Sequence, residues 1–72
     1  MRYLVIEIQT AADGTVGNFV WSFSDRQLAE QKYHTVLASA AVSSLPKHAA
    51  AMLSNDGILI DRRCYEHNEI TE

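Results

Sequence analysis

The 72-residue sequence has little of what usually stabilises a very small protein. Cys64 is the only cysteine, so no disulfide can form within the chain. The longest dense apolar run, residues 3–8, is interrupted by Glu7 and falls far short of the about 20 residues that cross a membrane. The apolar stretch after Arg2 is also too short for a secretion signal. We therefore expect no membrane segment and a reduced, cytoplasmic setting, which suits a free thiol.

Basic residues are also scarce, with six Lys and Arg against nine Asp and Glu and a net charge of −3. They are scattered, and only Arg62 and Arg63 are adjacent. This mild acidity opposes contact with phosphates, so nucleic acid is not an expected partner. The content of 47% hydrophobic and 21% charged residues is ordinary for a globular domain and argues against disorder.

A chain this short buries only about 60% of its unfolded surface, so one core is barely sufficient without further help. Because disulfides are excluded and metal ligands are sparse, oligomerisation is the remaining source of stability. We therefore expect one domain over residues 1–72, with a flexible tail at 68–72, that forms a homodimer.

Alternating apolar residues predict two strands before a helix. Residues 2–9 alternate Leu4, Ile6 and Ile8 with their neighbours, and residues 18–23 alternate Phe19, Trp21 and Phe23 with Val20 and Ser22. Turn residues around Asp13 and Gly14 separate them, which predicts a hairpin.

A helix is predicted from about Ser24 to Val42. Ser24 is the expected cap, with Gln27 three residues on. One apolar stripe recurs with helical spacing, namely Ala29, Tyr33, Val36, Leu37 and Ala40. The residue before Pro46 avoids the helical region and ends the element.

Two more strands are predicted after the helix. Residues 47–54 alternate, and the Asn55-Asp56-Gly57 turn joins them to residues 58–67 in a second hairpin. The predicted fold class is therefore α+β, with the order β-β-α-β-β and a four-stranded antiparallel sheet that carries one helix on one face.

Both faces of this sheet are predicted to be apolar, although one helix covers only one. We assign Leu4, Ile6, Ile8, Phe19, Trp21, Phe23, Ile58 and Ile60 to one face, and Tyr3, Val5, Val20, Leu53, Leu59 and Tyr65 to the other. An exposed contiguous apolar patch is more often an interaction site than an accident.

Alanines crowd the second half of the helix and the third strand. Such small residues either seat the helix tightly on the sheet or line a flat surface where a second chain docks. For the second alternative, the candidate interaction surface comprises Ala38, Ala41, Val42, Ala49 and Ala51.

No residue pattern predicts catalysis. Cys64 and His67 lie three apart, which on a strand places them on opposite faces, and no pair of the three histidines has the spacing of a zinc site. A single cysteine on a strand is more often a small apolar filler than a nucleophile. We expect no enzymatic activity, no metal and no cofactor.

The most polar segment, residues 61–69, offers Arg62, Arg63 and Tyr65 as candidate polar contacts to phosphates and bases. Neighbouring acidic residues offset their charge, and a solvated edge strand explains the same composition, since charge protects sheet edges.

Residues 23–67 resemble small proteins carried on bacterial prophages and other mobile elements. The most distinctive matching pieces are Tyr33-His34, residues 37–43 ("LASAAVS") and residues 64–67 ("CYEH"). No activity is assigned to such proteins, so the resemblance implies a mobile-element setting and transfers no functional residue.

The sequence thus favours a protein-protein interaction module that pairs with itself, or with another protein. Two alternatives stay open. One is a nucleic-acid-associated regulator that uses Arg62, Arg63 and Tyr65. The other is an inhibitor of a host defence nuclease that presents Glu66, Glu69 and Glu72 in place of phosphates.

Overall fold

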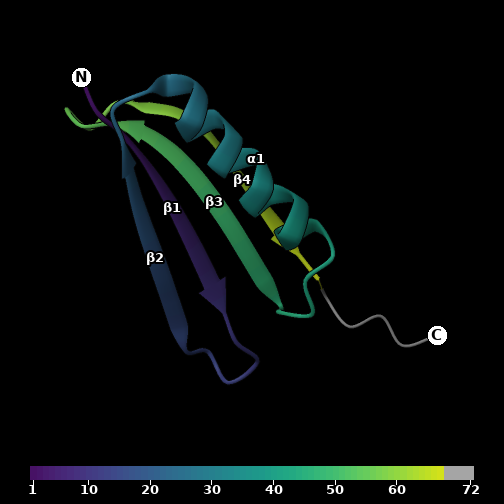
Figure 1. Cartoon of the computed structure of the whole chain (residues 1–72). Coiled ribbons are helices and arrows are strands. Elements are labelled where there is room, and N and C mark those ends of the chain that lie inside the picture. The colour runs from purple at the N-terminus through teal and green to yellow at the C-terminus, as the bar shows by residue number, and fades with distance from the viewer. Residues whose placement is uncertain (68–72) are drawn as a thin grey trace.

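The computed structural model describes residues 1–67 of the chain, which form a four-stranded sheet and one helix (Figure 1). The elements are β1 (Tyr3–Thr10), β2 (Val16–Phe23), α1 (Arg26–Ala41), β3 (Lys47–Ser54) and β4 (Leu59–Glu66). Every neighbouring pair of strands is antiparallel, and the strand order is β2-β1-β3-β4. The predicted fold class is confirmed, while the predicted tail at 68–72 lies outside the described residues.

Helix α1 lies on one face of the sheet, mainly over β3 (Figure 1). Its predicted apolar stripe is confirmed, because Ala29, Tyr33, Val36 and Ala40 are buried and Leu37 packs beside them.

The predicted cap of α1 is wrong by one residue. Asp25, and not Ser24, is the N-cap, and its carboxylate accepts a hydrogen bond of 2.8 Å from the Gln27 N–H. Asp25 has the extended backbone of an N-cap, with φ −109° and ψ 123°, so the helix begins at Arg26.

Both predicted hairpins are confirmed. In the second one the Gly57 N–H donates to the Ser54 carbonyl at 3.0 Å, and Gly57 has φ +89°, a conformation that glycine adopts without steric cost. The pairing of β3 with β4 shifts register between Met52 and Leu53.

The core between helix and sheet is small. Its fully buried hydrophobic residues are Val5, Ala29, Tyr33, Val36, Ala40, Ala50 and Met52. Three of these seven are alanines. Ala40 on the helix and Ala50 on β3 are among them, which supports the interpretation that small residues let the helix approach the sheet closely.

The predicted pairing of apolar strand faces is wrong in register. The β1–β2 register places Val5 opposite Trp21 and Ile6 opposite Val20. Five residues, 11–15, separate the two strands, and an odd number pairs odd positions with odd positions. Phe19, Trp21 and Phe23 therefore share the helix face with Tyr3 and Val5. Leu4, Ile6 and Ile8 share the opposite face with Val20, Leu53 and Leu59.

Two further residues, Ile60 and Ile58, do not lie on the face of the sheet that was predicted for them. Ile60, expected with Leu4, Ile6 and Ile8, packs instead against the buried core. Ile58 precedes β4 and is exposed, so it belongs to neither face of the sheet. The broader prediction is confirmed, since both faces carry apolar side chains and the helix covers one.

Candidate interaction surface

The face of the sheet opposite α1, here called the open face, carries apolar residues on all four strands. Its apolar residues are Leu4, Ile6 and Ile8 on β1, Val16 and Val20 on β2, Ala49, Ala51 and Leu53 on β3, and Leu59 on β4. Val16, Val20 and Leu59 are 58%, 56% and 49% exposed. None of the elements described over residues 1–67 covers this face. Nine apolar side chains thus form one surface.

Polar residues on the same face lie toward its margins. Asn18 and Ser22 belong to the edge strand β2, Arg62 and Glu66 belong to the edge strand β4, and Lys47 pairs with Glu66 at one end. An apolar centre with a polar rim is the usual anatomy of a protein-protein interface.

The candidate alanines do not form one surface. Ala49 and Ala51 lie on the open face, where they pair with Ile8 and Ile6 of β1. Ala38, Ala41 and Val42 are exposed on α1 or at its C-terminal end, on the other side of the sheet. Only the two β3 alanines therefore belong to a continuous apolar surface.

The candidate polar contacts are separated as well. Arg62 pairs with Ala51 and lies on the open face, whereas Arg63 pairs with Ala50 and lies on the helix face. The Arg63 guanidinium carbon lies 4.7 Å from the centre of the Tyr65 ring. Arg62 therefore shares no surface with Arg63 and Tyr65. Strand β4 is an edge strand, as its charge indicated.

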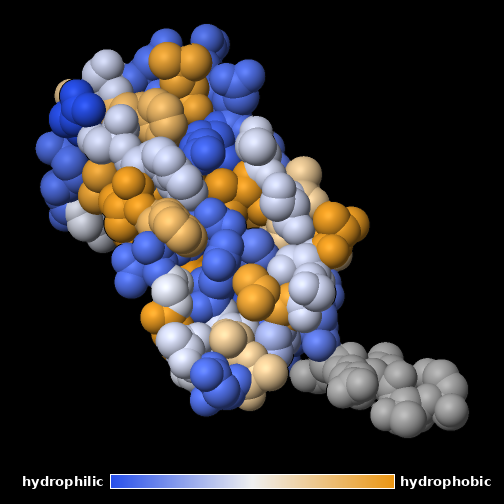
Figure 2. Space-filling model, turned by 60° about the horizontal axis from the view of Figure 1, so that its bottom comes forward, coloured by the Kyte–Doolittle hydropathy of each residue, from blue (hydrophilic) through white to orange (hydrophobic). Residues whose placement is uncertain are grey.

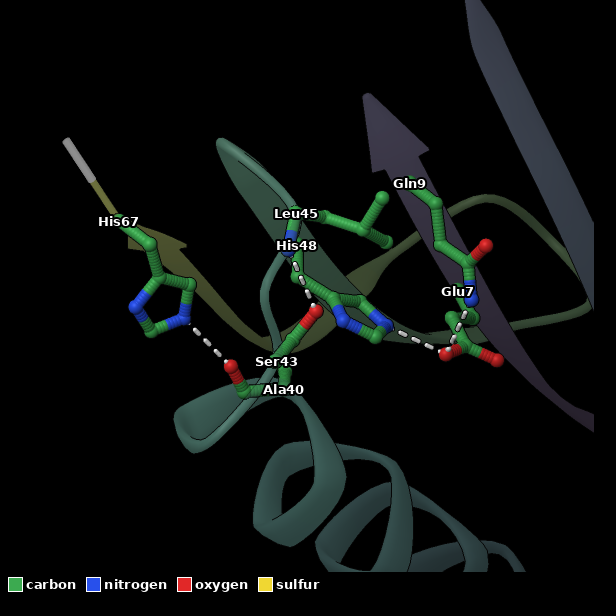
Figure 3. Close-up of polar contacts among 7 residues, drawn as sticks. All are labelled: Glu7, Gln9, Ala40, Ser43, Leu45, His48 and His67. Carbon is green, nitrogen blue, oxygen red and sulfur yellow. Dashed lines mark hydrogen bonds and ion pairs between the residues drawn. The ribbon is translucent and has the colours of Figure 1, made fainter. Parts of the chain in front are cut away.

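A buried polar pair that the sequence analysis missed lies on the helix face, near the C-terminal end of α1 (Figure 3). His48 Nε2 lies 2.5 Å from Glu7 Oε2, and the two side chains are only 5% and 12% exposed. The Gln9 amide also donates to Glu7 Oε2, at 3.1 Å. His48 Nδ1 is buried without a hydrogen-bond partner. A glutamate inside the apolar run of β1 and a histidine alternating with Ala50 and Met52 were the available signal.

The end of α1 is held by His67. The ring nitrogen Nε2 of His67 lies 2.7 Å from the Ala40 carbonyl oxygen, as Figure 3 shows. The backbone N–H of His67 donates to the Pro46 carbonyl at 2.8 Å. The last carbonyls of a helix lack partners within it, so this contact satisfies one of them. The residue closes the fold and does not line an open site.

Tyr33 and His34 divide between core and solvent. Tyr33 is 2% exposed and His34 is exposed, so the pair places an aromatic ring inside and a polar neighbour outside. Burial, and then the neighbouring Asp61 carboxylate, raise the pKa of the Tyr33 phenol above 10.0, its ordinary value.

The helix side carries its own aromatic group on β2. Phe19, which is half exposed, stacks on Trp21 with ring centres 6.1 Å apart, and the Lys32 ammonium lies 4.1 Å from the centre of the Trp21 ring. The contacts of Phe19 and Lys32 with Trp21 are local packing, with a cation over an aromatic face.

The surface displayed in Figure 2 shows hydrophobic residues separated by hydrophilic ones.

Sites for chemistry are not evident in the part of the chain that the structure describes. Residues 1–67 contain no group of three or more His, Cys, Asp or Glu side chains that could hold a metal ion, and no pocket is found among them. Cys64 is exposed on the open face. No helix within these residues is long and apolar enough to cross a membrane. Comparisons with protein-family models, curated proteins and solved structures found no match.

Proposed function

We propose that the protein is a non-enzymatic protein-protein interaction module that forms a homodimer through its open face. The observation that carries the proposal is the distribution of apolar residues. The core between helix and sheet holds seven buried hydrophobic residues, three of them alanine, with Tyr3, Trp21, Phe23, Leu37 and Ile60 packed against it, and nine further apolar residues line the uncovered face. Soluble monomers rarely expose a contiguous apolar surface of this kind without a binding role.

The area of the open face fits a second copy. Strands of eight residues are about 27 Å long, and four strands span about 19 Å, which gives about 500 Å² for each protomer. Two such faces bury about 1,000 Å² together, the lower limit for a specific interface. A dimer therefore needs nearly the whole face.

This arrangement does not favour a nucleic-acid role, because Arg62 lies on the opposite face from Arg63 and Tyr65.

We also propose a cytoplasmic location for the protein. The free thiol of Cys64 suits such a reducing setting.

The test is the solution mass by light scattering across a concentration series, for the wild type and for Ile6→Lys. Ile6 lies at the centre of the open face, between Val20 and Ala51. We expect a concentration-dependent dimer for the wild type and a monomer for Ile6→Lys, because the substitution puts a charge into the apolar centre. Thr35→Lys, at an exposed position on α1, is the control that should still dimerise. A wild type that is monomeric into the high micromolar range would refute the proposal.

A further inference from the structure

The open face has a definite relief. Three large side chains, Leu4, Ile6 and Ile8, stand in a row on β1, and we call them the β1 ridge. On the adjacent central strand, Ala49 and Ala51 pair with Ile8 and Ile6, and we call them the β3 trough. Beyond the trough, Arg62 and Cys64 of β4 flank these alanines. The ridge and the trough therefore run side by side, one strand apart.

A homodimer has a two-fold axis, and two orientations of this axis within the interface keep the strands of the two copies in line. An axis parallel to the strands that passes between β1 and β3 places β1 of each copy over β3 of the other. An axis perpendicular to the strands places β1 over β1 and β3 over β3. The first arrangement seats Ile6 and Ile8 of each copy over Ala51 and Ala49 of the other and places Leu4 over Leu53. The second stacks ridge on ridge and leaves a gap between the alanines.

We infer that two copies pack with their strands aligned, with Ile6 and Ile8 of each β1 ridge seated in the β3 trough of the other. This inference rests on the proposed function and adds the arrangement of the partner. Close-packed interfaces have few voids, so the arrangement that fills the trough is the one that buries the apolar side chains without gaps. Both arrangements keep the strands aligned, which is one of the two common geometries for sheets that meet face to face, so the fit of the ridge into the trough decides between them. Ala49 and Ala51 thus act as the receiving surface for Ile8 and Ile6.

The two arrangements respond in opposite directions to a larger side chain in the trough. In the inferred arrangement, Ala51→Ile collides with Ile6 of the other copy twice per dimer. We expect the dimer dissociation constant to rise about ten-fold or more, because inserted volume is costly in a well-packed interface. In the ridge-on-ridge arrangement, the same substitution fills a gap and tightens the dimer. Ala38→Ile, on the exposed side of α1, is the matched control and should change nothing.

The measurement is analytical ultracentrifugation of the wild type, Ala51→Ile, Ala38→Ile and Ile6→Ala, with circular dichroism to establish that each variant is folded. A mixture of Ala51→Ile with Ile6→Ala provides the second test. A heterodimer of these chains holds one native contact and one exchanged contact, so it should form more tightly than the Ala51→Ile homodimer.

The outcomes separate the two proposals. Weaker dimerisation of Ala51→Ile, with recovery in the mixture, supports the inferred arrangement. Unchanged or tighter dimerisation of Ala51→Ile, while Ile6→Lys still abolishes the dimer, overturns the arrangement and leaves the proposed function standing. A wild type that stays monomeric overturns both.

Discussion

Replacing Glu7 by leucine tests whether the buried Glu7–His48 contact is needed for stability. The change leaves His48 buried with neither ring nitrogen partnered, since Nδ1 already lacks a partner. A buried polar group that loses its partner destabilises a protein by about 1–3 kcal/mol. A domain of this size has a total stability of about 4–11 kcal/mol, so this loss is a large fraction of it.

The expected loss of about 2 kcal/mol corresponds to a fall in melting temperature of about 8–16 °C for a domain of this length. The assay is thermal unfolding followed by circular dichroism at one fixed protomer concentration, because dimerisation would make the melting temperature depend on concentration. Glu30→Leu is the matched control. It removes a carboxylate from an exposed ion pair with Arg26, and such pairs contribute at most about 1 kcal/mol.

The double variant Glu7→Leu/His48→Leu tests whether the stability loss of Glu7→Leu comes from leaving His48 buried without a partner. Replacing both partners of a buried polar pair by apolar groups of similar size is nearly neutral, whereas removing one partner is not. We therefore expect the double variant to recover most of the stability that Glu7→Leu loses. A double variant that is less stable than Glu7→Leu would refute this account of the pair, because it would mean that the two side chains contribute independently of each other.

Three smaller changes test the local structure. Since the raised pKa of Tyr33 favours its neutral form in the folded state, the contribution of Tyr33 to stability should be fully present below pH 10.0 and should be lost as the pH rises from there through the higher pKa of the folded state. Tyr33→Phe should flatten this alkaline decline in urea titrations, and an unchanged decline would contradict the assignment. Asp25→Ala should destabilise by about 1 kcal/mol in urea unfolding, and Asp25→Ser should not, because serine can also cap the helix. Gly57→Ala should destabilise by about 1 kcal/mol, since φ is +89° there, whereas Gly17→Ala should not carry this strain.

The elements of the fold could be predicted because their signals are local. Alternation identified the strands, the Asn55-Asp56-Gly57 turn identified the second hairpin, and the spacing from Ala29 to Ala40 identified the buried side of the helix. Each of these patterns lies within a single segment. The identity of the cap was the exception, because Ser24 and Asp25 are adjacent and both residue types are strong N-caps.

The grouping of residues across strands could not be predicted in the same way. Whether Leu4 lies beside Ser22 or beside Phe23 depends on one residue in the length of the first hairpin loop, and a shift of one residue exchanges the two faces. The Glu7–His48 contact depends on the same kind of information, because its partners are 41 residues apart in sequence. The sequence pattern shows that a polar residue interrupts the apolar face of a strand, but it does not show which residue of another strand contacts it.

The division of small and large residues between the two faces links the fold to the proposed function. On the helix face, Ala50 belongs to the same buried core as Ala29, and its small side chain lets α1 lie close to the sheet. On the open face, the neighbouring alanines of the same strand leave a depression beside Ile6 and Ile8. Strand β3 therefore receives the helix with Ala50 and, in the arrangement inferred above, a second copy of the chain with Ala49 and Ala51. This division is one reason why β3 can be rich in alanine within a sheet. Ala50 packs into the core under the helix, and in the proposed dimer Ala49 and Ala51 pack against Ile8 and Ile6 of the second copy.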